Sequence, residues 1–216
     1  AFQAAPGQSI LYNTQLAKLE EVNSYKNLLN PRWKGKILMN DPTVAGNGNF
    51  IFSTSVAFFM GDDYWREFVK YQAPVILRDD RLLVEWIAFG KYVLSLGGSS
   101  GPDEEFIAAG APIKSINPAE GSALTTGFGA IVALNKAPHP NAAALFVNWL
   151  LSKEGMTEFS KGTAYASRRI DIPTGHLHPS GVPNPKVKYI FETPEVLEEN
   201  TRLDPLLKEI FGPLLK

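Results

Sequence analysis

The sequence contains no cysteine, and its 216 residues include only three histidines. The lack of cysteine excludes disulfide bonds, thiolate nucleophiles and thiolate metal ligands, and it is compatible with work in an oxidising compartment. Lysine and arginine form no runs, and the formal net charge is -1. Neither nucleic acid nor an anionic membrane surface is therefore indicated as a partner.

Long apolar runs and nucleotide-binding motifs are also missing. No apolar segment approaches the ~20 residues of a membrane-spanning helix, and the first residues, AFQAAPGQS, lack the basic start and apolar stretch of a signal peptide. The glycine spacings fit neither GxGxxG nor GxxxxGK[ST]. With 44% hydrophobic residues, the composition indicates a globular protein with a sizeable core, for which small solutes remain as ligands.

The most informative stretch is ILMNDPTVAGNGNFIFSTSVAFF, residues 37–59. A short apolar run ends before Pro42, which cannot donate to a strand ladder, and helical spacing follows Asn49. We interpret the stretch as strand, loop and helix, with Asn47 or Asn49 as the helix cap. The free amide groups and partial positive charge of such a helix start can hold an anion. The plainer interpretation is an ordinary Gly/Asn connection between a strand and a helix.

Short apolar runs then alternate with amphipathic segments. Strands are expected at 37–39, 74–77, 92–96 and 113–116, with helices starting near residues 49, 64, 82 and 102. This β-α-α-β-α-β-α-β pattern predicts an α/β fold with a mainly parallel sheet covered by helices on both faces. Ligands of such sheets bind at the carboxyl ends of the strands. The loops after Met39, Leu77 and Leu96 are therefore the expected binding edge.

The character of the sequence changes after Glu120. A glycine-rich segment, residues 121–129, leads into an expected strand at 130–134 and indicates a crossing to a second body. Helices are expected at 140–151 and 152–159. The tail from Tyr165 is richer in proline and ends in an expected helix at 205–215.

One segment matches a hydrolase motif. Residues 97–101, GGSSG, fit G-x-S-x-G and lie between an expected strand and an expected helix, as the nucleophile of an α/β-hydrolase does. However, only two clear strands precede the strand that leads into the motif, and the histidines stand in proline-rich surroundings without an acid partner in the expected order. A binding or structural turn is the preferred interpretation, and a serine hydrolase is the alternative.

Further charged and histidine residues allow either a ligand-binding role or a purely structural one. Arg78 follows an expected strand and can present its guanidinium to an anion, or residues 78–81 are a helix start capped by aspartate. Arg168 and Arg169 carry the same two interpretations. His176-Leu177-His178 offers two imidazoles, but a metal site needs three or four ligands. We therefore expect no resident metal and no cofactor.

Several segments, in this order and spacing, resemble the periplasmic solute-binding proteins of ABC importers, in particular the group described as ferric-iron-type or family 1 extracellular solute-binding proteins. The segments that carry the resemblance are ILYNT (10–14), LNPRWKGKI (29–37) leading to Asp41-Pro42, the stretch from Glu120-Gly121 to Thr126-Gly127, APHPNAA (137–143), FVNWLLSKEG (146–155) and YASRR (165–169). The resemblance covers nearly the whole chain.

The resemblance implies two α/β lobes joined by hinge strands, which enclose a ligand between them when they close. It implies a hinge strand and entry at 1–14, a second lobe at 15–122, and a return crossing with C-terminal helices that pack on the first lobe at 123–216. The chain would then correspond to the C-terminal two-thirds of such a protein. It also implies a periplasmic or extracellular location and an ABC permease in the inner membrane as partner.

The family's first lobe would normally cover part of the C-terminal helices. Leu145, Trp149 and Leu150 are the residues that we expect to pack on it. Without that cover, we expect the chain to self-associate.

The resemblance also bears on the ligand. Ferric-binding members carry a tyrosine pair in the loop that corresponds to GGSSG here, so a small anionic organic molecule or an oxyanion is favoured, and ferric iron is the alternative. We expect a binding protein and not an enzyme. The candidate ligand-binding residues are Thr43, Gly46, Asn47, Gly48, Asn49, Arg78, Ser99, Ser100, Tyr12 and Tyr165.

Overall fold

The computed structural model describes residues 3–7, 10–97, 102–125, 131–163, 165–177, 181–191 and 193–215. The chain divides into two compact units. Unit 1 comprises Ala1–Pro6 and Leu124–Pro185, and unit 2 comprises Gly7–Ala123 and Lys186–Lys216. The division predicted from the sequence, with boundaries at 14 and 122, stays a prediction.

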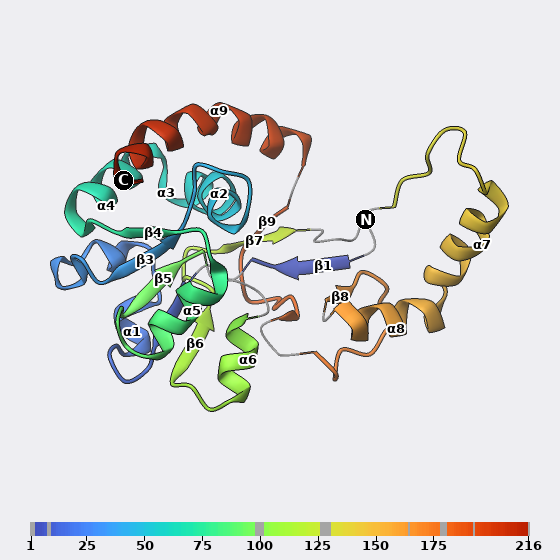
Figure 1. Cartoon of the computed structure of the whole chain (residues 1–216), viewed down its shortest axis with the longest axis horizontal. Coiled ribbons are helices and arrows are strands. Elements are labelled where there is room, and N and C mark those ends of the chain that lie inside the picture. The colour runs from blue at the N-terminus through green and yellow to red at the C-terminus, as the bar shows by residue number, and fades with distance from the viewer. Residues whose placement is uncertain are drawn as a thin grey trace. The chain divides into compact units, whose positions relative to one another are not determined.

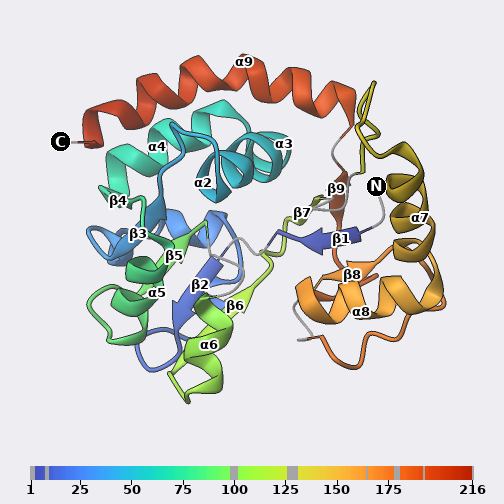
Figure 2. The same cartoon turned by 45° about the vertical axis from the view of Figure 1, so that its right-hand side comes forward.

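Unit 2 is built on a five-stranded sheet with the order β4-β3-β5-β2-β6 (Figures 1 and 2). β3 pairs in parallel with β4 and β5, whereas β2 runs antiparallel to β5 and β6. Within this sheet only β2 runs antiparallel to the other strands, which confirms the predicted mainly parallel sheet. The strands are β2 (Ile10–Asn13), β3 (Ile37–Asn40), β4 (Val75–Leu77), β5 (Leu94–Leu96) and β6 (Ile113–Ile116).

Helices connect and cover these strands. The helical segments of unit 2 are α1 (Leu19–Val22), α2 (Asn47–Phe50), α3 (Ala57–Met60), α4 (Asp62–Gln72), α5 (Asp80–Ala88), α6 (Pro102–Ala108) and α9 (Pro194–Phe211), with the 3-10 turns η1 (Lys26–Leu29), η2 (Pro31–Trp33) and η5 (Gly212–Leu214). A π-helical segment, η3 (Ile51–Val56), joins α2 to α3 without a break.

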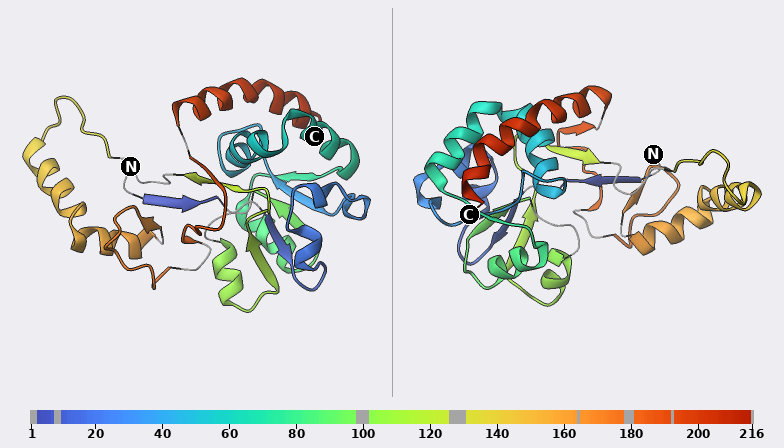
Figure 3. Two further views of the ribbon diagram at one scale, coloured as in Figure 1. Left: turned by 180° about the vertical axis from the view of Figure 1, so that it is seen from behind. Right: turned by 45° about the horizontal axis from the view of Figure 1, so that its top comes forward.

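The sheet of unit 2 has a core on each face, because successive residues of a strand point to opposite sides. Ile37 and Met39 of β3 belong to a core shared with η3, α4 and α9. Leu38, between them, belongs to a second core formed with α5 and joined by side chains of α6. Figures 2 and 3 show α4 and α9 on one side of the sheet and α5 and α6 on the other. This arrangement confirms the predicted cover on both faces.

The C-terminal helix α9 is longer than the expected helix at 205–215. It begins at Pro194, where Thr193 caps it by accepting a hydrogen bond from the backbone N–H of Val196, and Pro205 lies inside it. Proline at the first helical position is favoured because its missing N–H has no partner there anyway. α9 packs in unit 2, which differs from the expectation that the C-terminal helices pack on the first lobe.

Unit 1 combines short strands with two helices, α7 (Pro140–Leu150) and α8 (Lys153–Thr163). β1 (Gln3–Pro6) pairs antiparallel with β8 (Ala166–Ser167) and with the end of β7 (Ser122–Thr125). Leu150, Met156 and Ile172 form its small core. β9 (Tyr189–Phe191) belongs to unit 2, where the N–H of Ser122 donates to the carbonyl of Lys188 at 2.9 Å.

The prediction of a strand at 130–134 is wrong for residues 131–134, which are the described part of that range. Residues 131–134 have no regular secondary structure, and residues 126–130 lie outside the described ranges. The strand is instead β7, because Leu124 and Thr125 find a partner in β1. Both segments are apolar enough to form a strand, and only the partner distinguishes them.

Candidate functional site

The loops after β3, β4 and β5 begin at one edge of the unit 2 sheet. Asn40 pairs with Leu77, and Met39 pairs with Leu96, so the carboxyl ends of the three parallel strands are level. This edge is the one expected from the strand pattern, since side chains of the connecting loops converge there. The polar residues of these loops therefore define the candidate site.

The side chain of Asn40 ties the first two loops together. Its Nδ2 donates to Oδ1 of Asp80, and its Oδ1 accepts a hydrogen bond from the backbone N–H of Gly48 at 3.1 Å. Nδ2 of Asn47 donates to the other oxygen of Asp80 at 3.4 Å. The end of β3, the start of α2 and the start of α5 are thus joined by one aspartate and two amides.

Glycine is required at two positions of this edge. A Cβ atom on Gly48 would lie 2.4 Å from the carbonyl oxygen of Asn40 and 2.6 Å from that of Asp41. A Cβ atom on Gly97 would lie 2.9 Å from Cβ of Asn40, and Gly97 also has a φ of +81°. Side chains at either position would force these loops apart.

The helix that follows the first loop is capped differently from the prediction. Gly46 is the N-cap, with a φ of 150°, and no side chain caps the helix. The predicted cap by Asn47 or Asn49 is wrong because both lie inside the helix and their amides are engaged elsewhere. Nδ2 of Asn49 donates to the carbonyl of Pro42 at 3.1 Å and to Oδ1 of Asp204 at 3.0 Å.

The first turn of this helix retains backbone donors. The N–H of Gly48 is taken by Asn40, and the N–H of Phe50 donates to the carbonyl of Gly46 at 2.9 Å. The N–H groups of Asn47 and Asn49 have no acceptor within the described part of the chain. Such unpaired amides are typical of a helix start, and they favour an anionic group at this end.

Arg78 is held at the same edge by a buried carboxylate. Asp41 is only 1% exposed; its Oδ1 accepts hydrogen bonds from the N–H and the Oγ1 of Thr43 at 2.8 and 2.7 Å, and its Oδ2 accepts one from Nε of Arg78 at 2.8 Å. The Arg78 side chain is 69% exposed. Thr43, predicted as a ligand residue, thus uses its hydroxyl and its N–H to hold Asp41.

The pKa values of Asp41 and Asp80 at this edge depend on burial, hydrogen bonds and a neighbouring charge. Burial by itself would raise the pKa of Asp41, but the hydrogen bonds from Thr43 and Arg78 outweigh it and lower the pKa. Burial raises the pKa of Asp80, the hydrogen bond from Asn40 lowers it in part, and the charge of Asp79 raises it further. Asp41 is therefore firmly ionised at neutral pH and forms a charged pair with Arg78.

The helix-start interpretation of residues 78–81 is confirmed, and the binding interpretation of Arg78 stays a prediction. Oδ1 of Asp79 accepts a hydrogen bond from the N–H of Leu82 at 2.9 Å and caps α5. Arg78 stands before this cap, and its terminal nitrogens have no acceptor among the residues that the structure describes. The helix start is thus structural, while Arg78 keeps donors for a ligand.

Among the described residues of unit 2, Tyr12 is the predicted ligand residue that does not lie at this edge. Tyr12 is 4% exposed in the core and pairs with Leu94, two residues before the end of β5; burial, and then the charge of Glu20, raises its pKa. Tyr165 belongs to unit 1, and its carbonyl accepts a hydrogen bond from Ser160 at 2.6 Å. Ser99 and Ser100 lie outside the described residues.

Three residues of the edge were not among the predicted ligand residues, namely Asn40, Asp41 and Asp80. All three are polar and stand at the end of an expected strand or shortly after it, which is the sequence signal that could have identified them. Their partners lie as far as 40 residues away in the sequence. No local pattern reveals such pairs.

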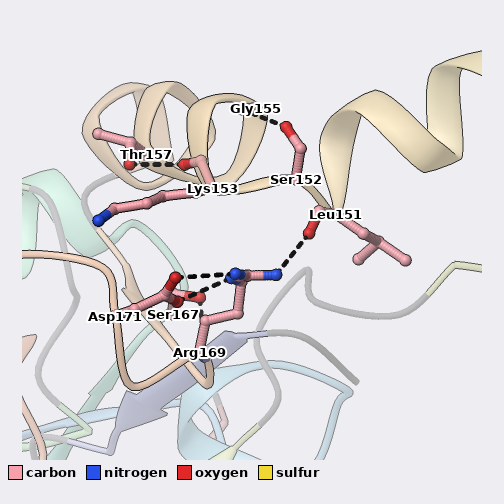
Figure 4. Close-up of polar contacts among 8 residues, drawn as sticks. All are labelled: Leu151, Ser152, Lys153, Gly155, Thr157, Ser167, Arg169 and Asp171. Atoms are coloured by element: carbon pink, nitrogen blue, oxygen red, sulfur yellow. Dashed lines mark hydrogen bonds and ion pairs between the residues drawn. The ribbon is translucent and has the colours of Figure 1, made fainter.

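Arg169 has a structural role in unit 1 (Figure 4). Its Nε and Nη2 donate to the two oxygens of Asp171 at 2.9 and 2.8 Å, and its Nη1 donates to the carbonyl of Leu151 at 3.0 Å. Leu151 is the C-cap of α7, so Arg169 satisfies an end carbonyl of that helix. Arg168 is exposed, and Nε2 of His176 lies 3.1 Å from Oγ of Ser160.

The described residues contain neither a metal-binding cluster nor a membrane-spanning helix. No group of three or more histidines, cysteines, aspartates or glutamates among them is arranged to hold a metal ion. No helix among them has the length and apolar character needed to cross a membrane.

Residues 2–175 match the family model described as bacterial extracellular solute-binding protein. A comparison with curated protein sequences found no match.

Solved structures share the fold of the whole chain. Iron-bound HitA from Pseudomonas aeruginosa has a TM-score of 0.71 and 16% identity, over 97% of this chain and 68% of HitA. AfuA from Actinobacillus pleuropneumoniae, with fructose-6-phosphate bound, has a TM-score of 0.67 and 20% identity, over 99% of this chain and 67% of AfuA. IdiA (FutA) from Trichodesmium, in complex with iron and citrate, has a TM-score of 0.66 and 19% identity, over 99% of this chain and 69% of that protein.

Proposed function

Because the chain belongs to the bacterial extracellular solute-binding protein family, we propose that it is the substrate-binding component of an ABC import system. It captures a small solute in the periplasm or outside the cell and delivers it to a permease in the inner membrane. Binding, and not chemical conversion, is its task. The solute is held between two lobes that close around it.

The solute is an anionic organic molecule or an oxyanion. The observation that carries this proposal is Arg78, fixed by the buried Asp41 and with its terminal nitrogens unpaired within the described residues. The unpaired amides of Asn47 and Asn49 supply neutral donors at the same edge. A guanidinium and helix-start amides together suit a carboxylate or a phosphate.

The carboxylates of the edge accept hydrogen bonds from groups of the protein itself. Asp41 accepts hydrogen bonds from Thr43 and Arg78, Asp79 caps α5, and Asp80 accepts from two asparagine amides. Each of the three is therefore occupied by protein donors. Arg78 is the charged group of the edge that retains donors for a solute.

Ferric iron is the second candidate solute. Two of the similar structures are described with iron bound, one of them together with citrate, and iron carried with an organic anion would use the same donors. Phenolate oxygens are the ligands expected for iron alone, and Tyr12 is buried in the core of unit 2. If the solute is iron together with an organic anion, the residues of this edge support binding of the anion more than binding of the iron.

Native mass spectrometry of the protein as purified, followed by denaturation to release any retained molecule, tests the proposal first. Titration calorimetry with inorganic phosphate, fructose 6-phosphate, citrate and ferric citrate then measures affinity. We expect at least one of the anions to bind in the absence of iron. Binding of ferric ion without any anion would contradict the anionic assignment.

Arg78→Ala is the decisive variant. Charge-assisted hydrogen bonds contribute about 1.5–3 kcal/mol, so we expect the affinity for the bound anion to fall about 10- to 100-fold. Arg81→Ala is the matched control, since Arg81 is an exposed arginine three residues away that pairs with Glu105. Equal effects of the two substitutions would rule out a specific role for Arg78.

The serine hydrolase alternative has its own test. A serine-directed phosphonylating probe labels an activated nucleophile and leaves the hydroxyl of a binding loop unmodified. We expect no covalent adduct on Ser99 by intact-protein mass spectrometry. A stoichiometric adduct there would favour the hydrolase.

A further inference from the structure

We infer that Asp41 is a positioning residue, which orients Arg78 so that both terminal nitrogens of its guanidinium bind one oxyanionic group of the solute. The group is a carboxylate or a phosphate, because both offer two oxygens at the spacing of the two nitrogens. This inference rests on the proposed solute-binding function and adds to it the residue that fixes the geometry.

Asp41 is itself rigidly held. Its Oδ1 accepts two hydrogen bonds from Thr43, and its backbone N–H donates to the carbonyl of Leu77 at 3.0 Å. Leu77 directly precedes Arg78, so the carboxylate is anchored to the strand that carries the guanidinium. With 1% exposure, Asp41 has no room to turn toward solvent.

A buried carboxylate needs a charged partner, because an unpaired ion inside a protein is costly. Arg78 supplies that partner with Nε alone, at 2.8 Å from Oδ2. A guanidinium is planar and carries five N–H donors in a fixed fork. The bond to Asp41 fixes the direction of the Nε–H group, and the edge formed by Nη1 and Nη2 remains for a ligand.

This division of donors explains why arginine stands at position 78. A lysine has one compact ammonium group, which pairs with Asp41 or with the solute but does not present a flat two-point edge to the solute. The positive charge of Arg78 is also balanced by Asp41. Recognition therefore depends on directed hydrogen bonds more than on net charge. The site then selects solutes by the positions of their oxygen atoms.

A double-mutant cycle tests the inference. The variants are Asp41→Asn, Arg78→Ala and both together, and the affinities for inorganic phosphate and for citrate are measured by titration calorimetry. We expect Asp41→Asn to weaken binding about tenfold, and to have no further effect once Arg78 is alanine. The two probes tell whether the site takes phosphate or carboxylate groups.

Asp79→Asn is the matched control. It removes the same charge from the same edge, and asparagine remains a good N-cap for α5. We expect its affinities to stay within about twofold of the wild type. Arg78→Lys serves as a second variant that does not disturb the folded loop, and we expect it to lose affinity as Arg78→Ala does.

A spectroscopic measurement reports the orientation directly. The Nε–H of Arg78 should be protected from solvent exchange in the ¹⁵N NMR spectrum of the wild type, and Asp41→Asn should abolish that protection. Loss of affinity without loss of protection would indicate a merely structural effect and overturn the inference.

The outcomes separate this inference from the proposed function. If the wild type binds neither phosphate nor citrate nor any other anion, the anionic assignment fails and this inference fails with it. If the wild type binds an anion but the effects of Asp41→Asn and Arg78→Ala are additive, only the inference is overturned. Full affinity in Arg78→Lys would overturn it as well.

Discussion

Asp41 and Asp80 lie at the same edge of the sheet, yet their pKa values shift in opposite directions. Thr43 and Arg78 lower the pKa of Asp41 against the effect of burial. Burial and the nearby Asp79 raise the pKa of Asp80 despite the hydrogen bond from Asn40. Hydrogen-bond partners, and not the aspartate itself, decide which carboxylate is strongly acidic.

These shifts predict the pH dependence of stability. A lowered pKa means that Asp41 stabilises the fold fully above the ordinary aspartate pKa of about 4, and that this contribution is lost as the pH falls through the lowered value. Urea unfolding of wild type and Asp41→Asn at pH 7, 5 and 3 measures it. We expect the variant to lose less stability than the wild type on acidification.

Asp80 provides the control of opposite sign. Its raised pKa means that the ionised form costs stability, so the fold gains stability as the pH falls through the raised value. Asp80→Asn removes that gain and should lose more stability than the wild type between pH 7 and pH 3. Identical pH profiles for all three proteins would contradict the assigned shifts.

At the scale of elements, α9 is part of the core of unit 2. Phe211 is fully buried, and its ring centroid lies 4.9 Å from that of Phe52 and 5.8 Å from that of Trp65. Phe52 stacks on Trp65 with centroids 3.6 Å apart. The last helix of the chain thus closes an aromatic cluster that begins in η3 and α4.

Phe211→Ala tests this role. Removal of a buried phenylalanine side chain costs about 3–5 kcal/mol, and we expect the free energy of unfolding to fall by that amount in urea titrations. Leu215→Ala is the control, because Leu215 is 36% exposed and surface substitutions stay within about 0.5 kcal/mol. If both variants unfold like the wild type, α9 does not pack on unit 2 in solution.

At the scale of the whole molecule, unit 1 carries an uncharged apolar face. α7 contains no charged residue, and Leu145, Phe146 and Trp149 are 73%, 55% and 46% exposed. Together with residues 131–134, α7 lines a groove of about 810 Å³. Leu150, which we expected on this face, is instead buried against Met156 and Ile172.

We expect this face to drive self-association, because an apolar patch without charges lowers its free energy when a second copy covers it. Sedimentation velocity should show species larger than the monomer that increase with concentration, and Leu145→Glu should suppress them. Phe89→Glu is the control, since Phe89 is 78% exposed in unit 2. A monomer at all concentrations would contradict the prediction.

Much of unit 2 was predictable from the sequence. The alternation of apolar runs and amphipathic segments identified β3, β4, β5 and β6 and the helices between them, because periodicity depends on local spacing alone. The same alternation identified the sheet edge where the loops converge. The family followed from segments spread over nearly the whole chain, and residues 2–175 match its model.

Only the tertiary structure decided which partner each polar group and each apolar segment finds. Asp41 and Arg78 are 37 residues apart, and no local pattern predicts that this carboxylate pairs with this guanidinium. β7 forms instead of a strand at 131–134 because β1 pairs with it, and α9 begins eleven residues earlier than expected because Thr193 caps it. Sequence patterns determined the helices and strands, because these depend on local spacing. The geometry of the site depends on contacts between residues far apart in the sequence, and only the tertiary structure shows those contacts.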